Sequence, residues 1–136
     1  MSHNCQFLVF RCMDFRITSK ALSELLSEID CLEGTYDLVS VAGSGRDLLY
    51  SAGGSDFLLK QITKSIALHN IGEIIVFAHD NCGAYGISSD KEERKVQKQD
   101  LVKIKDMIIA NFPDIAFQGY IIRGVSVGKL ILEKVI

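Results

Sequence analysis

The sequence lacks any long uninterrupted hydrophobic stretch. Apolar residues make up 48% of its 136 residues, but they occur in short runs that polar groups interrupt. A bilayer-spanning helix needs about 20 consecutive apolar residues, so the sequence excludes one. The first ten residues, MSHNCQFLVF, also lack a basic segment and a small-residue cleavage site. Without an export signal we expect a cytoplasmic protein.

The sequence also lacks any long block of like charge. Its 15 basic and 17 acidic side chains give a net charge of −2. This balance argues against nucleic acid or an anionic membrane as the main partner. No internal repeat, linker or low-complexity segment is present, so we predict a single domain over residues 1–136.

The chain contains four cysteines, and in a cytoplasmic protein most of them should be reduced thiols. Cys5 precedes an apolar run and Cys31 follows a helical pattern. We expect both to be small buried hydrophobic residues rather than chemically active groups. His3 lies near the start of the chain and His69 beside Asn70 at a predicted helix end, so we expect surface or capping roles for both.

Hydrophobic patterning predicts strands and helices in regular alternation. Short apolar runs predict strands at residues 7–10, 36–42, 74–78, 115–122 and 127–135, of which the last two should form a hairpin. Helical spacing begins at Thr18 or Ser19 and ends near residue 34, and it recurs from about Ser55 to Asn70. A last helix ends at Pro113, and the charged segment 88–100 before it is a solvated loop or the start of that helix.

The order of these elements predicts an α/β fold. We expect a single domain with a mainly parallel, four-stranded sheet, helices on both faces and one antiparallel edge strand. In such sheets functional groups gather beyond the carboxyl ends of the strands.

Three potential metal ligands lie at predicted strand ends. Cys12 follows the first strand, and His79 and Cys82 follow the third. A cysteine at a strand end is often a core residue, and a His-x-x-Cys spacing can arise without function, but their joint placement at one sheet edge favours a metal site. Two thiolates and an imidazole suit zinc. Three protein ligands leave the fourth tetrahedral position open, which is typical of catalytic zinc.

Asp14 and Arg16 lie next to the first of these ligands. In an extended turn, Cys12, Asp14 and Arg16 can project to the same side. A carboxylate close to zinc can bind the metal or accept a proton from a water bound to it, and a bidentate arginine would decide which. The alternative is a surface ion pair without a functional role.

The glycine-rich loop after the second strand has two interpretations. Gly43-Ser44-Gly45 is similar to a phosphate-binding turn, but the third glycine of that pattern is absent and Leu48 stands nearby. We therefore expect the loop to form a wall near the metal, with contributions from Ser44, Arg46 and Asp47.

Two motifs resemble those of a known family. Cys-Met-Asp-Phe-Arg at residues 12–16 and His-Asp-Asn-Cys-Gly at residues 79–83 resemble the Cys-x-Asp-x-Arg and His-x-x-Cys signatures of the β-class carbonic anhydrases. The intervening elements and the hairpin at residues 121–132 are similar too, so the resemblance covers nearly the whole chain. It implies a zinc enzyme that reversibly hydrates carbon dioxide to bicarbonate. Cys12, His79 and Cys82 would be the ligands and Asp14 with Arg16 the catalytic dyad.

The resemblance also implies a homodimer or higher homo-oligomer whose partner subunit completes the pocket. Family members usually carry an N-terminal helical arm, whereas here we expect the first strand almost at the start of the sequence. Many members also have Asn-Ala-Gly where this sequence has Val41-Ala42-Gly43. These departures bear on the shape of the pocket. Two rival functions therefore stay open: a zinc hydrolase of a carbon dioxide analogue such as carbonyl sulfide or carbon disulfide, and a non-catalytic zinc- or anion-binding protein.

Overall fold

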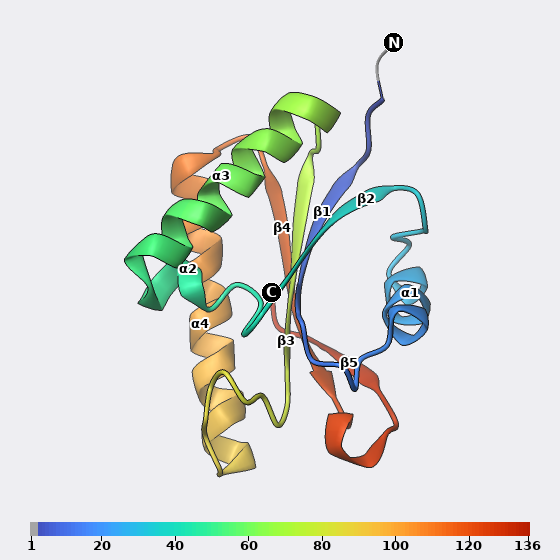
Figure 1. The fold of residues 1–136 in the computed structure, drawn as a ribbon, viewed down its shortest axis with the longest axis vertical. Coiled ribbons are helices and arrows are strands. Elements are labelled where there is room, and N and C mark those ends of the chain that lie inside the picture. Colours follow the sequence, from blue (N-terminus) through green and yellow to red (C-terminus); the bar gives the residue numbers. More distant parts are fainter. Residues whose placement is uncertain (1–2) are drawn as a thin grey trace.

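The computed structural model describes residues 3–136, which form one twisted sheet with helices on both faces (Figure 1). In chain order the elements are β1 (Phe7–Cys12), α1 (Ser19–Glu28), β2 (Tyr36–Val41), α2 (Asp47–Tyr50), α3 (Ala52–His69), β3 (Glu73–His79), α4 (Asp90–Asn111), β4 (Ala116–Arg123), a 3₁₀ turn (Val125–Val127) and β5 (Ile131–Lys134). The strand order is β2-β1-β3-β4-β5. The first four are parallel, and β5 runs antiparallel to β4.

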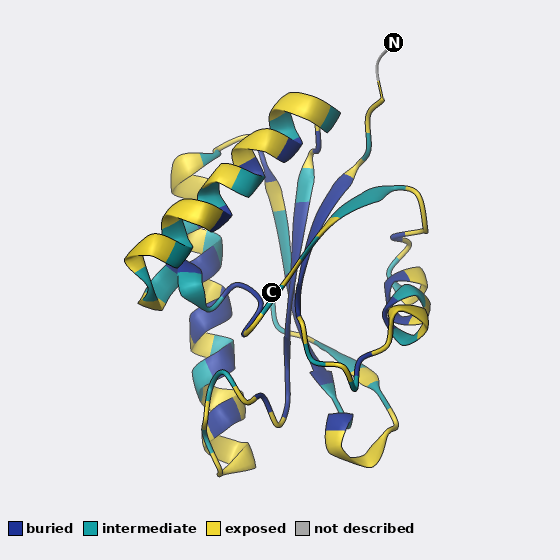
Figure 2. Ribbon diagram, in the orientation of Figure 1, coloured by how far each residue is buried: buried dark blue, intermediate teal, exposed yellow. Residues whose placement is uncertain are grey.

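The central strands are buried on both faces, as their continuous apolar runs predict. Along β1, Leu8 and Phe10 join the core beneath α2, α3 and α4, whereas Phe7 and Val9 join the core beneath α1. Figure 2 shows this buried band running through the sheet between the two helical layers. Each strand thus presents alternate side chains to the two layers, which fixes the direction of the residues that follow it.

Side-chain caps define where the helices begin. The hydroxyls of Thr18, Ser51 and Ser89 accept hydrogen bonds from the first turns of α1, α3 and α4. Asn70, with a left-handed φ of 53°, ends α3. The Thr18 cap and the Asn70 end confirm two predicted boundaries.

The predicted fold class is confirmed, with two corrections to the sheet. It has five strands rather than four, because β5 is added at the edge of four parallel strands. The last strand is also shorter than predicted and begins at Ile131, because the chain first passes through the 3₁₀ turn between Gly124 and Gly128. Both glycines have positive φ, of 84° and 70°.

Two helical boundaries differ from the prediction, and one short helix was not predicted. α1 ends at Glu28 rather than near residue 34, α3 begins at Ala52, and the loop before it contains the short helix α2. The charged segment is the first half of α4. None of the helices in residues 3–136 has the length and hydrophobicity that a bilayer-spanning segment requires.

Candidate metal centre

Two strand ends and one loop bring three potential ligands together. Cys12 is the last residue of β1, His79 is the last residue of β3, and Cys82 lies in the loop before α4. Their ligand atoms all lie within 4.8 Å of one another, and all three residues are buried. Zinc–sulfur and zinc–nitrogen bonds of about 2.3 and 2.0–2.1 Å fit a cluster of this size.

A backbone carbonyl group of the next residue orients the imidazole of His79 toward this cluster. Nδ1 lies 2.6 Å from the carbonyl oxygen of Asp80 and donates to it in the tautomer that this contact requires. The other ring nitrogen, Nε2, is buried and has no hydrogen-bond partner in the described part of the chain. A buried polar atom without a partner is costly, and a metal ion at this position would remove that cost.

The two thiols share one proton in the absence of a metal. A hydrogen bond from Cys82 lowers the pKa of Cys12 to about 4, against the opposing effect of burial, and His79 adds to the lowering. For the same reason, and through burial, the pKa of Cys82 is raised far above that of a free thiol. Burial alone would lower the pKa of His79, but the neighbouring Cys12 sulfur, the carbonyl oxygen of Asp80 and the charge of Asp14 together outweigh burial and leave that pKa raised. A divalent cation would stabilise both thiolates together.

Gly43 completes the environment of the Cys12 sulfur. Its N–H donates to Cys12 Sγ at 3.4 Å, and its φ of 76° is one that residues with a side chain rarely adopt. A Cβ at this position would lie 3.1 Å from the Cβ atoms of both Ala84 and Arg46. The glycine therefore allows the loop after β2 to approach the cluster closely.

The rest of that loop contributes less to the site than predicted. Ala42 lines the hollow beside the cluster, but Ser44, Arg46 and Asp47 are not among its lining residues. The guanidinium of Arg46 instead lies over the rings of Tyr50 and Tyr85, at 4.8 and 5.4 Å from their centroids.

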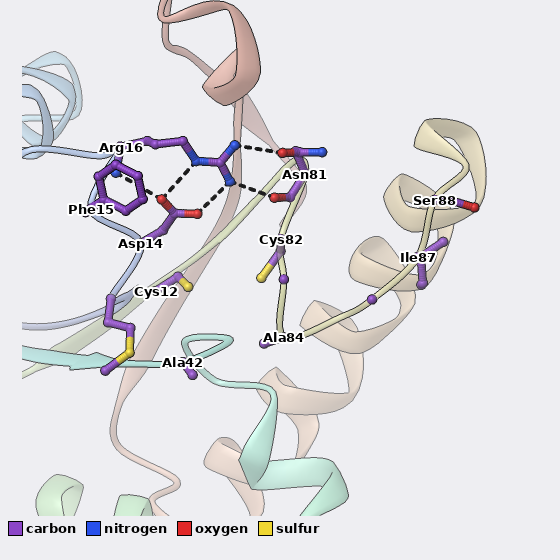
Figure 3. Close-up of a pocket in the computed structure, with 13 residues that line it drawn as sticks. Cys12, Asp14, Phe15, Arg16, Ala42, Asn81, Cys82, Ala84, Ile87 and Ser88 are labelled. Carbon is purple, nitrogen blue, oxygen red and sulfur yellow. Dashed lines mark hydrogen bonds and ion pairs between the residues drawn. The ribbon is translucent and has the colours of Figure 1, made fainter.

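Asp14 and Arg16 form a bidentate pair next to the cluster (Figure 3). Arg16 donates from Nε to Asp14 Oδ1 at 3.0 Å and from Nη2 to Oδ2 at 2.7 Å. These bonds lower the pKa of Asp14 to about 2. Oδ2 lies 3.7 Å from Nε2 of His79, so the carboxylate faces the position that a metal would take.

Arg16 also connects the two motifs. Its Nη1 donates to Oδ1 of Asn81 at 2.7 Å, and its Nη2 to the carbonyl oxygen of Asn81 at 2.9 Å. The segment after β1 is thereby joined to the loop after β3. The pair is a link across the site and not an isolated surface ion pair.

A buried arginine that the sequence analysis missed supports the segment carrying Asp14. Arg11, only 6% exposed, donates to the backbone carbonyl oxygens of Cys12, Asp14 and Ile17. The alternation of side chains along the strand gives no reason to expect a supporting role for Arg11. Its role depends on the turn that follows, which brings three carbonyl groups around one guanidinium.

A buried glutamate, also missed, supports the loop carrying Cys82. Glu93 in α4 is 1% exposed and accepts from the N–H groups of Asn81 and Cys82, at 2.7 and 2.9 Å. One helical turn later, Gln97 donates to the carbonyl oxygen of His79 at 2.7 Å. α4 therefore fixes both ends of the His-x-x-Cys segment.

Asp80 fixes the same segment from the opposite side. Its two carboxylate oxygens accept from the N–H groups of Gly124 and Val125, at 2.8 and 3.0 Å. Asp80 is buried, and its own N–H donates to the carbonyl oxygen of Ile122. The three potential ligands are thus held by residues that do not themselves belong to the cluster.

A hollow of about 790 Å³ lies in front of the cluster and is lined by Cys12, Asp14, Arg16 and Cys82, together with the apolar side chains of Ala42, Ala84 and Ile87. Phe15 on its rim is 87% exposed. In Figure 3 the two sulfur atoms and the Asp14 carboxylate lie around one space between the strand ends. The site therefore combines a potential metal centre, a carboxylate and an open apolar approach.

The chain has relatives of related sequence. An uncharacterized protein of Rickettsia conorii is 30% identical over 122 residues, which cover 79% of this chain and 62% of that protein. The chain therefore spans less than two thirds of that relative's length. An uncharacterized protein of Rickettsia bellii is 28% identical over 141 residues, covering 93% of this chain and 82% of that protein.

Solved structures share the fold. A carbonic anhydrase from Glaciozyma antarctica is similar over 100% of this chain and 85% of its own, with a TM-score of 0.57 and 19% identity. A tetrameric β-carbonic anhydrase from Sordaria macrospora is similar over 98% of this chain and 81% of its own, with a TM-score of 0.59 and 13% identity. Residues 2–123 also match the sequence profile of a family described as "Putative carbonic anhydrase". The chain belongs to this carbonic anhydrase family.

Proposed function

We propose that the protein is a zinc enzyme that reversibly hydrates carbon dioxide to bicarbonate. The observation that carries the proposal is the buried Cys12–His79–Cys82 cluster, in which Nε2 of His79 has no partner within residues 3–136 and faces Asp14. These three side chains would hold the zinc and leave one coordination position toward the hollow. Bound zinc would lower the pKa of water toward neutrality and so supply a nucleophile.

Asp14 would orient the attacking water rather than bind the metal. Both of its carboxylate oxygens are engaged by Arg16, and it lies outside the group of ligand atoms within 4.8 Å of one another. With a pKa of about 2 it stays ionised at any physiological pH. The carboxylate of Asp14 can therefore accept a hydrogen bond from the attacking water at the open side of the site. This hydrogen bond would fix the direction in which the lone pair of the water oxygen points.

The hollow suits a small uncharged substrate. Ala42, Ala84 and Ile87 present apolar surface beside the cluster, and carbon dioxide needs no hydrogen-bonding partner to enter such a space. Arg16 is the positively charged side chain on the hollow's lining, so it would also attract the bicarbonate anion in the reverse direction.

We further propose that the functional unit is a homodimer or larger homo-oligomer. β2 lies at the edge of the sheet and carries the exposed Leu38, and Phe15 and Met13 expose apolar surface on the rim of the hollow. Burial of these groups against a second copy would also narrow the approach to the site. Sedimentation at micromolar concentration tests this, and an active monomer would contradict it.

The test of the reaction is a comparison of substrates on one zinc-loaded preparation. We expect rapid carbon dioxide hydration that is lost when zinc is removed by a chelator and restored when it is added back. Hydrolysis of carbonyl sulfide or carbon disulfide in place of carbon dioxide hydration would favour the rival zinc hydrolase. Zinc binding without any of these reactions would favour a non-catalytic protein.

A further inference from the structure

A second group of potential ligands lies at the opposite end of the parallel strands, where the strands begin. Cys5 precedes β1, Asp37 is the second residue of β2, and His69 ends α3. Their ligand atoms all lie within 4.8 Å of one another. In Figure 1 the end of α3 and the N-terminal segment lie at the far end of the molecule from the loop between β3 and α4. This amino-edge cluster is therefore separate from the candidate metal centre.

Hydrogen bonds hold the side chains of Asp37 and His69 together, and the thiol of Cys5 donates to the carbonyl oxygen of Phe7 at 3.6 Å. Asp37 Oδ2 lies 2.7 Å from Nδ1 of His69 and accepts from the hydroxyl of Ser65, one helical turn earlier, at 2.6 Å. The backbone N–H of Cys5 donates to the carbonyl oxygen of His69 at 3.0 Å. The N-terminal segment, β2 and α3 thus meet at one point before any ligand binds, which reduces the ordering that a ligand would require.

A second imidazole lies beside the cluster. The ring of His3 lies 5.2 Å from the ring of His69, in an edge-on arrangement. The side chains of His69 and Asp37 are 31% and 30% exposed, so an ion can reach them from solvent. A thiolate, a carboxylate and two imidazoles form a donor set that suits zinc-class ions and fills a tetrahedral coordination shell.

A nucleophilic role for Cys5 fits the geometry less well. Burial and the negative charge of Asp37 raise the pKa of its thiol, whereas catalytic cysteines need a stabilised thiolate. A divalent cation would instead favour the thiolate of Cys5 beside the carboxylate of Asp37 and would neutralise both negative charges. Their charges add to −2, and the two neutral imidazoles leave the loaded site uncharged.

We propose that Cys5, Asp37 and His69, joined by His3, form a second, structural site for a divalent ion of the zinc class. Cys5 would bind as the thiolate after its proton is released to solvent, and His69 as a neutral imidazole. With four protein ligands this site has no open position for a substrate. Its effect is to bind the N-terminal segment to β2 and α3.

The test counts metal ions and follows their removal. Zn²⁺ and Co²⁺ are titrated into the wild type and into Cys12→Ser/Cys82→Ser, which lacks the first site. We expect two ions per chain in the wild type and one in the double variant, with a cobalt spectrum that retains a thiolate band. Adding Cys5→Ser to the double variant should abolish the remaining binding, whereas Cys31→Ser, at a fully buried cysteine outside both clusters, should not.

A second arm keeps the test decisive if the double variant does not fold. In the otherwise wild-type chain, His69→Gln should lower the count from two ions to one and leave carbon dioxide hydration unchanged. Zinc should also raise the melting temperature of the wild type more than that of His69→Gln. One ion per chain in the wild type, or two ions in His69→Gln, would overturn the proposal.

Discussion

The carboxyl and amino ends of the parallel strands, called here the carboxyl edge and the amino edge, carry the same kinds of potential ligand. They differ in whether the histidine of each cluster already has its hydrogen-bond partners. At the carboxyl edge, Nε2 of His79 is buried without a partner in the described residues. At the amino edge, Nδ1 of His69 already lies 2.7 Å from Asp37, and both side chains are about 30% exposed. The first cluster needs a ligand to satisfy its buried polar atoms, whereas the second is satisfied without one. We therefore expect zinc to bind more tightly at the carboxyl edge.

The two clusters also differ in how many buried residues hold them in place. Buried Arg11 and Glu93 hold both segments of the first cluster through backbone groups. Around the second cluster, Ser65 supports the carboxylate of Asp37. A site with a rigid surrounding suits catalysis, which needs fixed geometry.

The largest effect should come from removing a ligand at the carboxyl edge. Cys82→Ser should lower zinc affinity there by more than the ~100-fold typical of outer-shell substitutions, because a thiolate is replaced by a weak hydroxyl ligand. Carbon dioxide hydration should be lost with it. Cys31→Ser is the matched control, since Cys31 is buried in the core beneath α1. Elemental analysis after dialysis measures the difference, and equal zinc content in both variants would refute the ligand assignment.

The next effect in size should come from acid, which should weaken zinc binding at the carboxyl edge. Protons and zinc compete for the same atoms, and the pKa values of Cys82 and His79 are both raised in the metal-free protein. Zinc affinity should therefore rise as pH rises, and fall as pH falls, by about tenfold per pH unit for each proton displaced. Competition with a chelator between about pH 8 and about pH 6 measures this slope. A zinc affinity independent of pH over that range would be inconsistent with thiolate and imidazole ligands.

A smaller effect should follow from weakening the support of the first cluster. Glu93→Gln removes the negative charge that accepts from Asn81 and Cys82, and should lower zinc affinity by about 10–100-fold. Glu92→Gln makes the same change at the exposed neighbouring position and should leave the affinity unaltered. If the two variants bind zinc equally well, Glu93 has no part in positioning Cys82.

The sequence predicts the cluster at the carboxyl edge because apolar runs show where the strands end. Cys12 and His79 end strands with continuous apolar runs, and parallel strands bring their carboxyl ends to one edge. A readable signal for Glu93 also existed. The buried stripe of α4 runs back from Ile108 and Ile104 through Gln97 to Glu93 at helical spacing, and only its polar character hid it.

Other features of the fold and of the two clusters have no signal in the nearby sequence. Arg11 is buried because three carbonyl groups of its own turn converge on it, which no spacing rule predicts. α2 has four residues, too few to be stable alone, and it forms because Leu48 packs into the core. Cys5 was expected to be a buried hydrophobic residue, but it is half-buried beside Asp37, because β2 and α3 converge there only in the folded chain.

The most direct test of the central claim is carbon dioxide hydration by zinc-replete wild type and Asp14→Asn, followed from about pH 7 to about pH 9. Two thiolate ligands make the zinc a weaker acid than three imidazoles would, so wild-type activity should be low near neutrality and rise above about pH 8. Asp14→Asn should retain its zinc, because the three ligands remain, and lose about 100-fold or more in rate. A zinc-replete wild type without activity across this range, or an Asp14→Asn variant as active as the wild type, would contradict the account.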